Sequence, residues 1–188
     1  MTSNWLVRPW LPIFAGLSEE EWDSFFRICS YSFDSKSLEQ YAAPYIYDGS
    51  TFLFPYRLGY SAWERCLPVS EKQRAMKLCL LTRHHNGFRR EAAAAELLNR
   101  KFAHKYPFVL PYLLRLTSEY IYPIINLIYE QRHNLPEDQA RHFRDWNKAF
   151  IARSRGRASS YWDCYFRHEH LALKDCASMK FLKWLEKV

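Results

Sequence analysis

Residues 70–99 read SEKQRAMKLCLLTRHHNGFRREAAAAELLN. Ser70 and Gln73 form a capping box, in which each side chain can bond the backbone N–H of the other residue, and this pattern predicts the start of a helix. Apolar residues then recur at spacings of three and four, and the helix is expected to end where Gly87 can adopt the left-handed conformation. The Ala- and Leu-rich run that follows predicts a second helix over residues 88–99. The stretch therefore predicts two helices joined by a tight turn.

Further helices are predicted after this pair from apolar spacing, from prolines near helix starts and from serines that can cap. They cover residues 108–116, 120–131, 136–153, 159–166 and 175–187. The basic run from Arg153 to Arg157 is expected to be a loop that ends the third of them. Buried helix faces are expected from apolar side chains at helical spacing, which comprise Phe143, Trp146, Phe150 and Ile151 in one helix and Met179, Leu182 and Leu185 in another.

The first third of the chain is less regular. Ser18 and Glu21 form another capping box, which predicts the start of a helix. Residues 45–60 are rich in aromatic side chains and contain Asp48-Gly49, a pair typical of tight turns. They are expected to form either a loop or a short extended hairpin. About eight helices are therefore expected in the whole chain.

Composition supports a mainly helical single domain. The chain has 188 residues, about the size of one domain, and its 5 glycines are too few for a Gly-rich phosphate loop or a hairpin-rich β fold. The 13 Phe, 13 Tyr and 7 Trp residues predict a core packed with aromatic rings. We expect an all-α domain over residues 1–188, with an irregular N-terminal part over 1–69 and a helical-pair region over 70–188.

The cysteines and the apolar segments bear on location. Five cysteines, an odd number without the spacing of a disulfide framework, are typical of a reduced protein, so a cytoplasmic protein without a signal peptide is expected. The longest apolar stretch, residues 108–129, contains Arg115, Glu119, Asn126 and two prolines. It is therefore expected to lie in a protein core rather than in a membrane.

Two segments of the chain are similar and lie 32 residues apart. Residues 86–94 and 118–126 each follow a helix and a turn and open a second helix. The run NGFRREA in the first, followed by FVLPYLLRL at 108–116, resembles bacterial HEAT-like repeat proteins over residues 70–131 and more weakly to residue 188. The resemblance implies an irregular HEAT-like array of helical pairs with an aromatic-rich N-terminal loop region. It also implies binding of protein, or occasionally of DNA, along one face.

Charge is unevenly distributed along the chain. The formal net charge is +7, with net −3 in residues 1–70 and net +10 in the remainder. A basic half favours an acidic partner, such as a nucleic acid, an anionic membrane or an acidic protein, although solvated helix faces are often basic as well.

Arginines gather where the helical pairs are expected to turn, and the turns of a repeat array line up on one side. The predicted partner-binding residues are Arg83, Arg89, Arg90, Arg153, Arg155 and Arg157. Arginine forks suit either phosphates or the carboxylates of a protein. We expect a non-enzymatic module that engages an acidic protein partner through this basic face, because no element that reads DNA bases is recognisable and residues 1–70 are acidic. The alternative is a HEAT-like nucleic-acid-binding protein and, with less support, a DNA-repair enzyme.

No catalytic residue, cofactor or metal is predicted. Motifs of zinc proteases, P-loop proteins and serine hydrolases do not occur in the sequence. The best candidates for zinc ligands lie within 13 residues and comprise Cys164, His168, His170 and Cys176. Their spacing matches no common zinc finger, and a buried thiol is the alternative role for Cys164. A repair enzyme needs aromatic rings around a base and a carboxylate near the sugar, and the residues to consider are Asp145-Trp146 and Trp162-Asp163.

Overall fold

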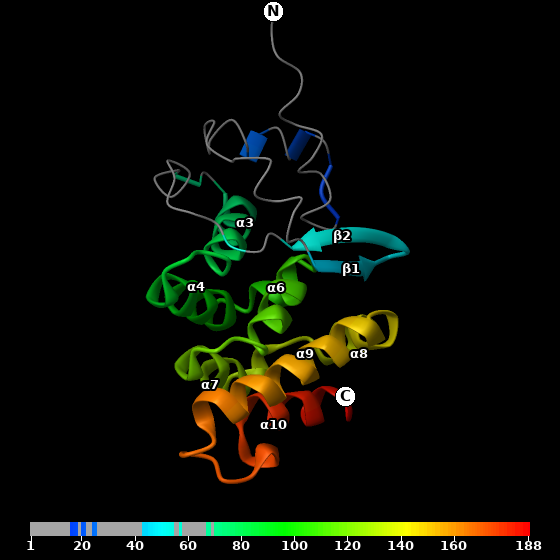
Figure 1. Ribbon diagram of the computed structural model, residues 1–188. Helices are drawn as coiled ribbons and strands as arrows, with labels where there is room; N and C mark the ends of the chain where they lie inside the picture. Colours follow the sequence, from blue (N-terminus) through cyan, green and yellow to red (C-terminus); the bar gives the residue numbers. More distant parts are fainter. Residues whose placement is uncertain are drawn as a thin grey trace, which may run out of the picture.

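The described part of the chain is mainly helical. The computed structural model describes residues 16–18, 20–21, 24–25, 43–54, 57, 67–68 and 70–188 (Figure 1). Within them lie eight α-helices and one two-stranded sheet, so the helical class predicted from the sequence is confirmed. The elements are β1 (Ala43–Tyr47), β2 (Ser50–Phe54), α3 (Glu71–Leu81), α4 (Gly87–Asn99), α5 (Phe102–Lys105), α6 (Val109–Leu116), α7 (Tyr122–Glu130), α8 (Glu137–Trp146), α9 (Lys148–Tyr161) and α10 (Ala177–Leu185).

The pair α3 and α4 forms where the sequence predicts it. Ser70 caps α3, because its Oγ accepts a hydrogen bond from the Gln73 backbone N–H at 3.2 Å. Asn86 caps α4 by accepting from the Phe88 backbone N–H at 2.9 Å. Both helix starts therefore depend on polar side chains in the same short stretch of sequence.

Gly87 has a different role from the one predicted. It is the first residue of α4, and the only described glycines with positive φ are Gly16 and Gly49. A Cβ at Gly87 would lie 2.5 Å from Cδ1 of Ile121, just before α7. The prediction of a left-handed cap is wrong, and the glycine instead makes room for a neighbouring segment.

Helix α6 lies at the centre of the described core. All eight of its residues are buried, and it packs against α3, α5, α7 and α8. Figure 1 shows α6 between the α3–α4 pair and the C-terminal helices. The apolar stretch that contains α6 is therefore a core segment, as expected. None of the helices in the described part of the chain combines the length and apolar content that a bilayer crossing requires.

The aromatic region before residue 60 contains a hairpin, which selects the second of the two predicted alternatives. Strands β1 and β2 pair antiparallel, with Tyr47 opposite Ser50. The two-residue turn has φ of 47° at Asp48 and 74° at Gly49, the geometry in which an Asp-Gly turn matches the twist of its strands. The ring of Tyr45 stacks on Phe54 with centroids 4.4 Å apart, which anchors the hairpin in the core.

The predicted helix over residues 136–153 is divided in two. α8 ends at Trp146, and α9 starts at Lys148 and continues to Tyr161. The predicted basic loop at residues 153–157 is therefore wrong, because these residues lie inside α9, and so is a helix start at Ser159 or Ser160.

The break occurs at Asn147, where the backbone leaves the helical region with φ −117° and ψ 40°. Its side chain accepts a hydrogen bond from the Ile46 N–H at 2.6 Å and donates to the Ile46 carbonyl at 2.8 Å. It also donates to the Phe143 carbonyl at 2.9 Å. This one buried amide joins the end of α8 to the hairpin.

The break also changes which side chains are buried. Phe143 and Phe150 lie in the core as predicted, but Trp146 is 49% exposed, which contradicts the predicted stripe. In α10, Leu182 and Leu185 are buried and Met179 is half-buried. Because the chain breaks at Asn147, the spacing that links Trp146 to Phe150 and Ile151 does not define one buried helix face.

The capping box at the N-terminal end is confirmed. The Ser18 N–H donates to the Glu21 carboxylate at 3.0 Å, and the Glu21 N–H donates to Ser18 Oγ at 3.3 Å. Phe25, at the spacing expected for a buried face, is fully buried. Most of the predicted helix that follows lies outside the described residues.

The glycine in the middle of α9 offers a test of the corrected helix boundaries. Gly156 lies inside α9, and no described atom lies within 4 Å of the position that its Cβ would take. We expect Gly156→Ala to stabilise the fold by about 1 kcal/mol, because alanine loses less backbone entropy in a helix. Urea unfolding measures the effect. The control Gly49→Ala should destabilise, because φ at this turn is positive. A loss of stability in Gly156→Ala would contradict the continuous α9.

Candidate functional site

A cavity of about 410 Å³ lies where the ends of α3 and α6 meet α9. Several arginines from distant parts of the chain line it. The lining comprises Arg57, Arg83, His85, Arg115, Ser118, Glu119, Tyr120, Arg157 and Tyr161, and we call this site the arginine cavity. Arg83 follows the end of α3, Arg115 is in the last turn of α6 and Arg157 is in α9. Packing of three helices therefore brings these cations together.

Glu119 is the only carboxylate in the lining that the structure describes, and it is 4% exposed. Its Oε2 accepts from Nη2 of Arg57 at 2.7 Å and from Nη2 of Arg90 at 3.4 Å. Its Oε1 lies 3.6 Å from Nη1 of Arg83. One buried carboxylate thus faces three guanidinium groups.

Arg90 lies behind the cavity wall and supports the turn between α3 and α4. It is fully buried, and its Nη1 donates to the carbonyl oxygens of His84 at 2.7 Å and His85 at 2.9 Å. Its guanidinium carbon also lies 6.0 Å from the ring centroid of Tyr120. These contacts fix the backbone from which Arg83 and His85 project.

Among the described residues that line the arginine cavity, arginines outnumber carboxylates. Arg83 is 2% exposed and Arg115 is 8% exposed. Burial, together with the positive charge of nearby Arg57, lowers the pKa of the Arg83 guanidinium to about 10. Removing a charge from water is costly unless an opposite charge is close, and among the described lining residues Glu119 supplies one negative charge. A bound anion would reduce this imbalance.

The cavity also offers hydrogen-bond donors. Nη1 of Arg57 is buried and makes no hydrogen bond to any described residue. Arg115 Nη1 lies 3.5 Å from the Ser118 hydroxyl, and Tyr120 and Tyr161 add phenol groups to the lining. Guanidinium and hydroxyl donors around a hollow match an oxyanion and offer little to a metal ion.

The six predicted partner-binding arginines are not equivalent. Arg83 and Arg90 are buried, so their prediction as exposed contact residues is wrong, and the reason is their shared pairing with Glu119. Arg157 lines the cavity together with Arg83.

The other three predicted arginines lie outside the lining. Arg89 and Arg153 are exposed on α4 and α9. Arg155 is half-buried and forms an ion pair with Glu186. The structure therefore brings together only part of the predicted set.

Three of the charged residues that line the site are not among the predicted binding residues. They are Arg57, Arg115 and Glu119. Arg115 and Glu119 are charged residues in an otherwise apolar stretch, and this pattern was the available signal, because a charge in a core segment needs a partner. Arg57 carries no such signal in the sequence.

The candidate zinc ligands do not form a metal site. Cys164 and His168 are exposed and Cys176 is buried, while the His170 ring stacks on Tyr122 with centroids 4.8 Å apart. Among the residues that the structure describes, no three His, Cys, Asp or Glu side chains are placed to hold a metal ion. The alternative of a buried Cys164 thiol is wrong too, because the residue projects from the surface at a π-helical segment, Trp162–Phe166.

The two Trp-Asp pairs do not line the arginine cavity. Asp145 bonds Arg144 at 2.8 Å, which lowers the pKa of its carboxyl group. Asp163 bonds Arg167 at 2.9 Å. Each of these ion pairs lies at the surface and joins two residues of the same helical region.

Compared with known proteins, the chain matches no protein-family model, no curated protein and no solved structure. Functional inference for this chain therefore rests on its own residues.

Proposed function

We propose that this protein is a non-enzymatic binding module that receives an anionic group of an acidic protein partner in the arginine cavity. The observation that carries the proposal is the group of arginines that, among the described residues, gathers around the single carboxylate of Glu119 in a hollow of about 410 Å³. An oxyanion that entered the cavity would meet several guanidinium donors at once. Hydrogen bonds between a guanidinium group and an oxyanion are roughly twice as strong as hydrogen bonds between neutral groups.

A phosphate monoester is the anion that best suits this charge. It carries close to two negative charges at neutral pH and three strong acceptor oxygens, whereas a carboxylate carries one charge and two oxygens. Arginine clusters are a recurrent way to recognise phosphorylated or acidic protein segments. Half-buried Arg157, on the α9 side, is placed to contact the ligand without holding the buried network together.

Nucleic acid is the second candidate, and one observation favours it. Tyr120 and Tyr165 are 46% and 59% exposed, with ring centroids 6.4 Å apart at the edge of the cavity. Exposed aromatic rings beside arginines can stack on the bases of a single strand.

The surface charges favour the protein partner over nucleic acid. A nucleic-acid face depends on many cations that neutralise successive phosphates. Here several surface cations already pair with carboxylates, including Arg74 and Arg100 with Glu96, and Lys105 with Glu71. The arginine cavity gathers several guanidinium groups around one hollow, which suits a single anionic group.

The HEAT-like arrangement is part of the proposal. Support comes from two helical pairs, α3 with α4 and α6 with α7, in which each pair packs together and α4 also packs on α7. In such an array the turns of successive pairs lie on one side. Arg83, Arg115 and Glu119 all lie at or beside these turns.

Removing the charge of Arg157 tests the proposed function. We expect wild-type protein to bind phenyl phosphate in isothermal titration calorimetry, and Arg157→Gln to weaken binding about tenfold, the loss of about 1.4 kcal/mol expected for one charge-assisted contact. Arg153→Gln is the matched control, because Arg153 lies one turn earlier on the exposed face of α9. Equal losses in both variants, or no binding of phenyl phosphate by the wild type, would contradict the proposal.

Salt dependence separates the two candidate partners. Binding of a single-stranded oligonucleotide across the basic surface should weaken steeply with salt, with a slope set by the number of phosphates contacted. A single anion in the arginine cavity should show a shallow slope. Affinity for the oligonucleotide that exceeds that for phenyl phosphate and survives Arg157→Gln would favour the nucleic-acid reading.

A further inference from the structure

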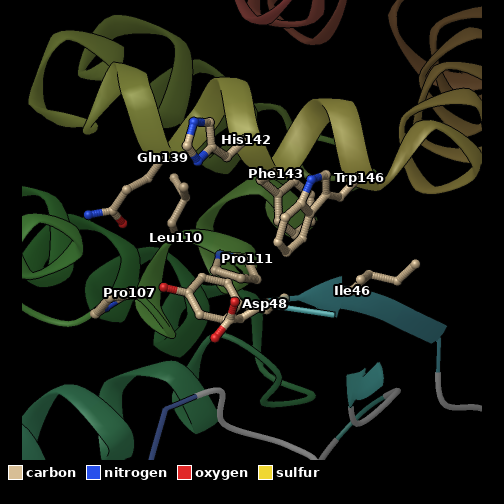
Figure 2. A pocket seen from close by; sticks show the side chains of 10 residues that line it. Ile46, Asp48, Pro107, Leu110, Pro111, Gln139, His142, Phe143 and Trp146 are labelled. Atoms are coloured by element: carbon tan, nitrogen blue, oxygen red, sulfur yellow. The ribbon is translucent and has the colours of Figure 1, made fainter. Parts of the chain in front are cut away.

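A second cavity, of about 340 Å³, lies on a different part of the molecule, where the hairpin turn meets α8 and the start of α6. Figure 2 shows Phe143 and Trp146 projecting from α8 toward Pro111, with Asp48 on the hairpin beyond it. Tyr47 also lines the space, and we call it the aromatic cavity. No residue of the arginine cavity contributes to it.

Aromatic rings form much of its surface. Phe143 is buried at 4% exposure and packs against Phe150, which fixes its ring. Trp146 is 49% exposed, which is costly for so large an apolar side chain. Asn147 ends α8 directly after Trp146, and its side chain forms a hydrogen bond with Ile46 of the hairpin. One buried amide thus holds the aromatic end of α8 against the strand that carries Tyr47.

The polar groups of the aromatic cavity are electron-rich. Within the described part of the chain its lining includes the Asp48 carboxylate but no lysine or arginine, although the protein carries a net charge of +7. The Gln139 Oε1 atom is buried and accepts no hydrogen bond from any described residue. Burial raises the pKa of the Tyr47 hydroxyl, and the Asp48 charge raises it further. His142 is the remaining titratable group in the lining.

We propose that the aromatic cavity binds an alkylated ammonium ion. The faces of aromatic rings carry partial negative charge and attract such cations, and their alkyl groups gain from contact with the apolar walls that Leu110 and the prolines provide. Asp48 supplies the formal negative charge, and Gln139 Oε1 can accept from any N–H that the ion retains. An anion in the aromatic cavity would be repelled by Asp48 and would contact no lysine or arginine among the described lining residues. The two cavities therefore select ligands of opposite charge.

The chemical class of the ligand follows from the groups that line the cavity. A bare metal cation prefers several oxygen ligands around it, and the lining offers one carboxylate and one amide oxygen. A neutral hydrocarbon would fill the apolar walls but leave Asp48 and Gln139 without a partner. An ammonium with methyl substituents satisfies both kinds of surface, and it is the class of ligand for which proteins use clusters of aromatic rings.

The test compares choline with 3,3-dimethylbutan-1-ol, which has the same shape without the charge. Binding to the full chain is followed by ligand-observed NMR titration. We expect choline to bind and the neutral alcohol to bind at least about tenfold more weakly, the range of a desolvated cation–π contact. Equal affinity for both compounds would show an unselective apolar crevice and overturn the proposal, as would no binding of choline at millimolar concentration.

Two variants locate the site. Trp146→Leu removes a half-exposed ring, and Asp48→Asn removes the charge while keeping a residue type that tolerates the φ of 47° at this turn. Each is expected to weaken choline binding at least fivefold. Phe88→Leu, at a ring that is 83% exposed on α4, is the matched control. Unchanged choline affinity in Trp146→Leu, with an unchanged melting temperature, would overturn the assignment.

Discussion

Replacing Glu119 with glutamine is expected to lower the free energy of unfolding by about 3–5 kcal/mol, as found when one partner of a buried ion pair is removed. The change preserves shape but removes the charge that faces Arg57, Arg83 and Arg90. An amide in this place also presents an NH₂ group to guanidinium donors. Urea unfolding measures the loss. Glu169→Gln, at an exposed carboxylate after the π-helical segment, is the control and should change little.

Added anion distinguishes a charge imbalance from a simple packing defect. If the loss in Glu119→Gln arises from uncompensated arginines, phosphate should raise the melting temperature of this variant more than that of the wild type, at matched ionic strength. A packing defect would give the same small increase in both. A loss below about 1 kcal/mol would contradict the central place of Glu119 in the cluster.

Asn147→Ala is expected to cost about 2–4 kcal/mol, because it leaves three backbone groups without their partner. These are the N–H and carbonyl of Ile46 and the carbonyl of Phe143, all within 2.9 Å of the Asn147 side chain. Asn147 is 5% exposed, so in the alanine variant water has little access to hydrogen-bond these backbone groups. Asn99→Ala, at the exposed end of α4, is the control for loss of an asparagine from a helix end.

Asn147→Asp sharpens this prediction. The carboxylate keeps the acceptor for the Ile46 N–H but places its second oxygen against two carbonyl oxygens, where the amide had donated. Aspartate should therefore destabilise at least as much as alanine at pH 7. Because this setting disfavours the charged form, the folded-state pKa of the new carboxyl should lie above its unfolded value. The loss should then shrink as pH falls through that range. If aspartate were tolerated as well as asparagine, the amide would not be the link between α8 and the hairpin.

Several elements could be predicted because their signals are local. Ser70 caps α3, Pro123 lies in the first turn of α7, and Asp48-Gly49 forms the turn of the hairpin. Each signal acts through hydrogen bonds or dihedral angles within about four residues. The sequence carries all the information needed for such elements.

The candidate sites could be predicted only in part. The charge distribution indicated a basic half of the chain. The predicted partner-binding face, however, included Arg83 and Arg90, and both are buried against Glu119. Exposure of an arginine depends on whether a carboxylate reaches it, and here the carboxylate lies 29 residues beyond Arg90. Helical spacing likewise placed Trp146 on one buried face with Phe150 and Ile151, but the chain breaks at Asn147 between them.

The sequence by itself determined the helical class, the main helix starts and the basic character of residues 71–188, all of which depend on composition and on neighbours along the chain. Only the tertiary structure decided where α8 ends, why Gly87 has no side chain and which arginines share a cavity. Asn147 bonds to a strand 101 residues away, and Arg57 reaches Glu119 across 62 residues. The physical reason is that the cost of a buried charge or amide depends on the groups that packing brings against it, and these groups come from distant segments.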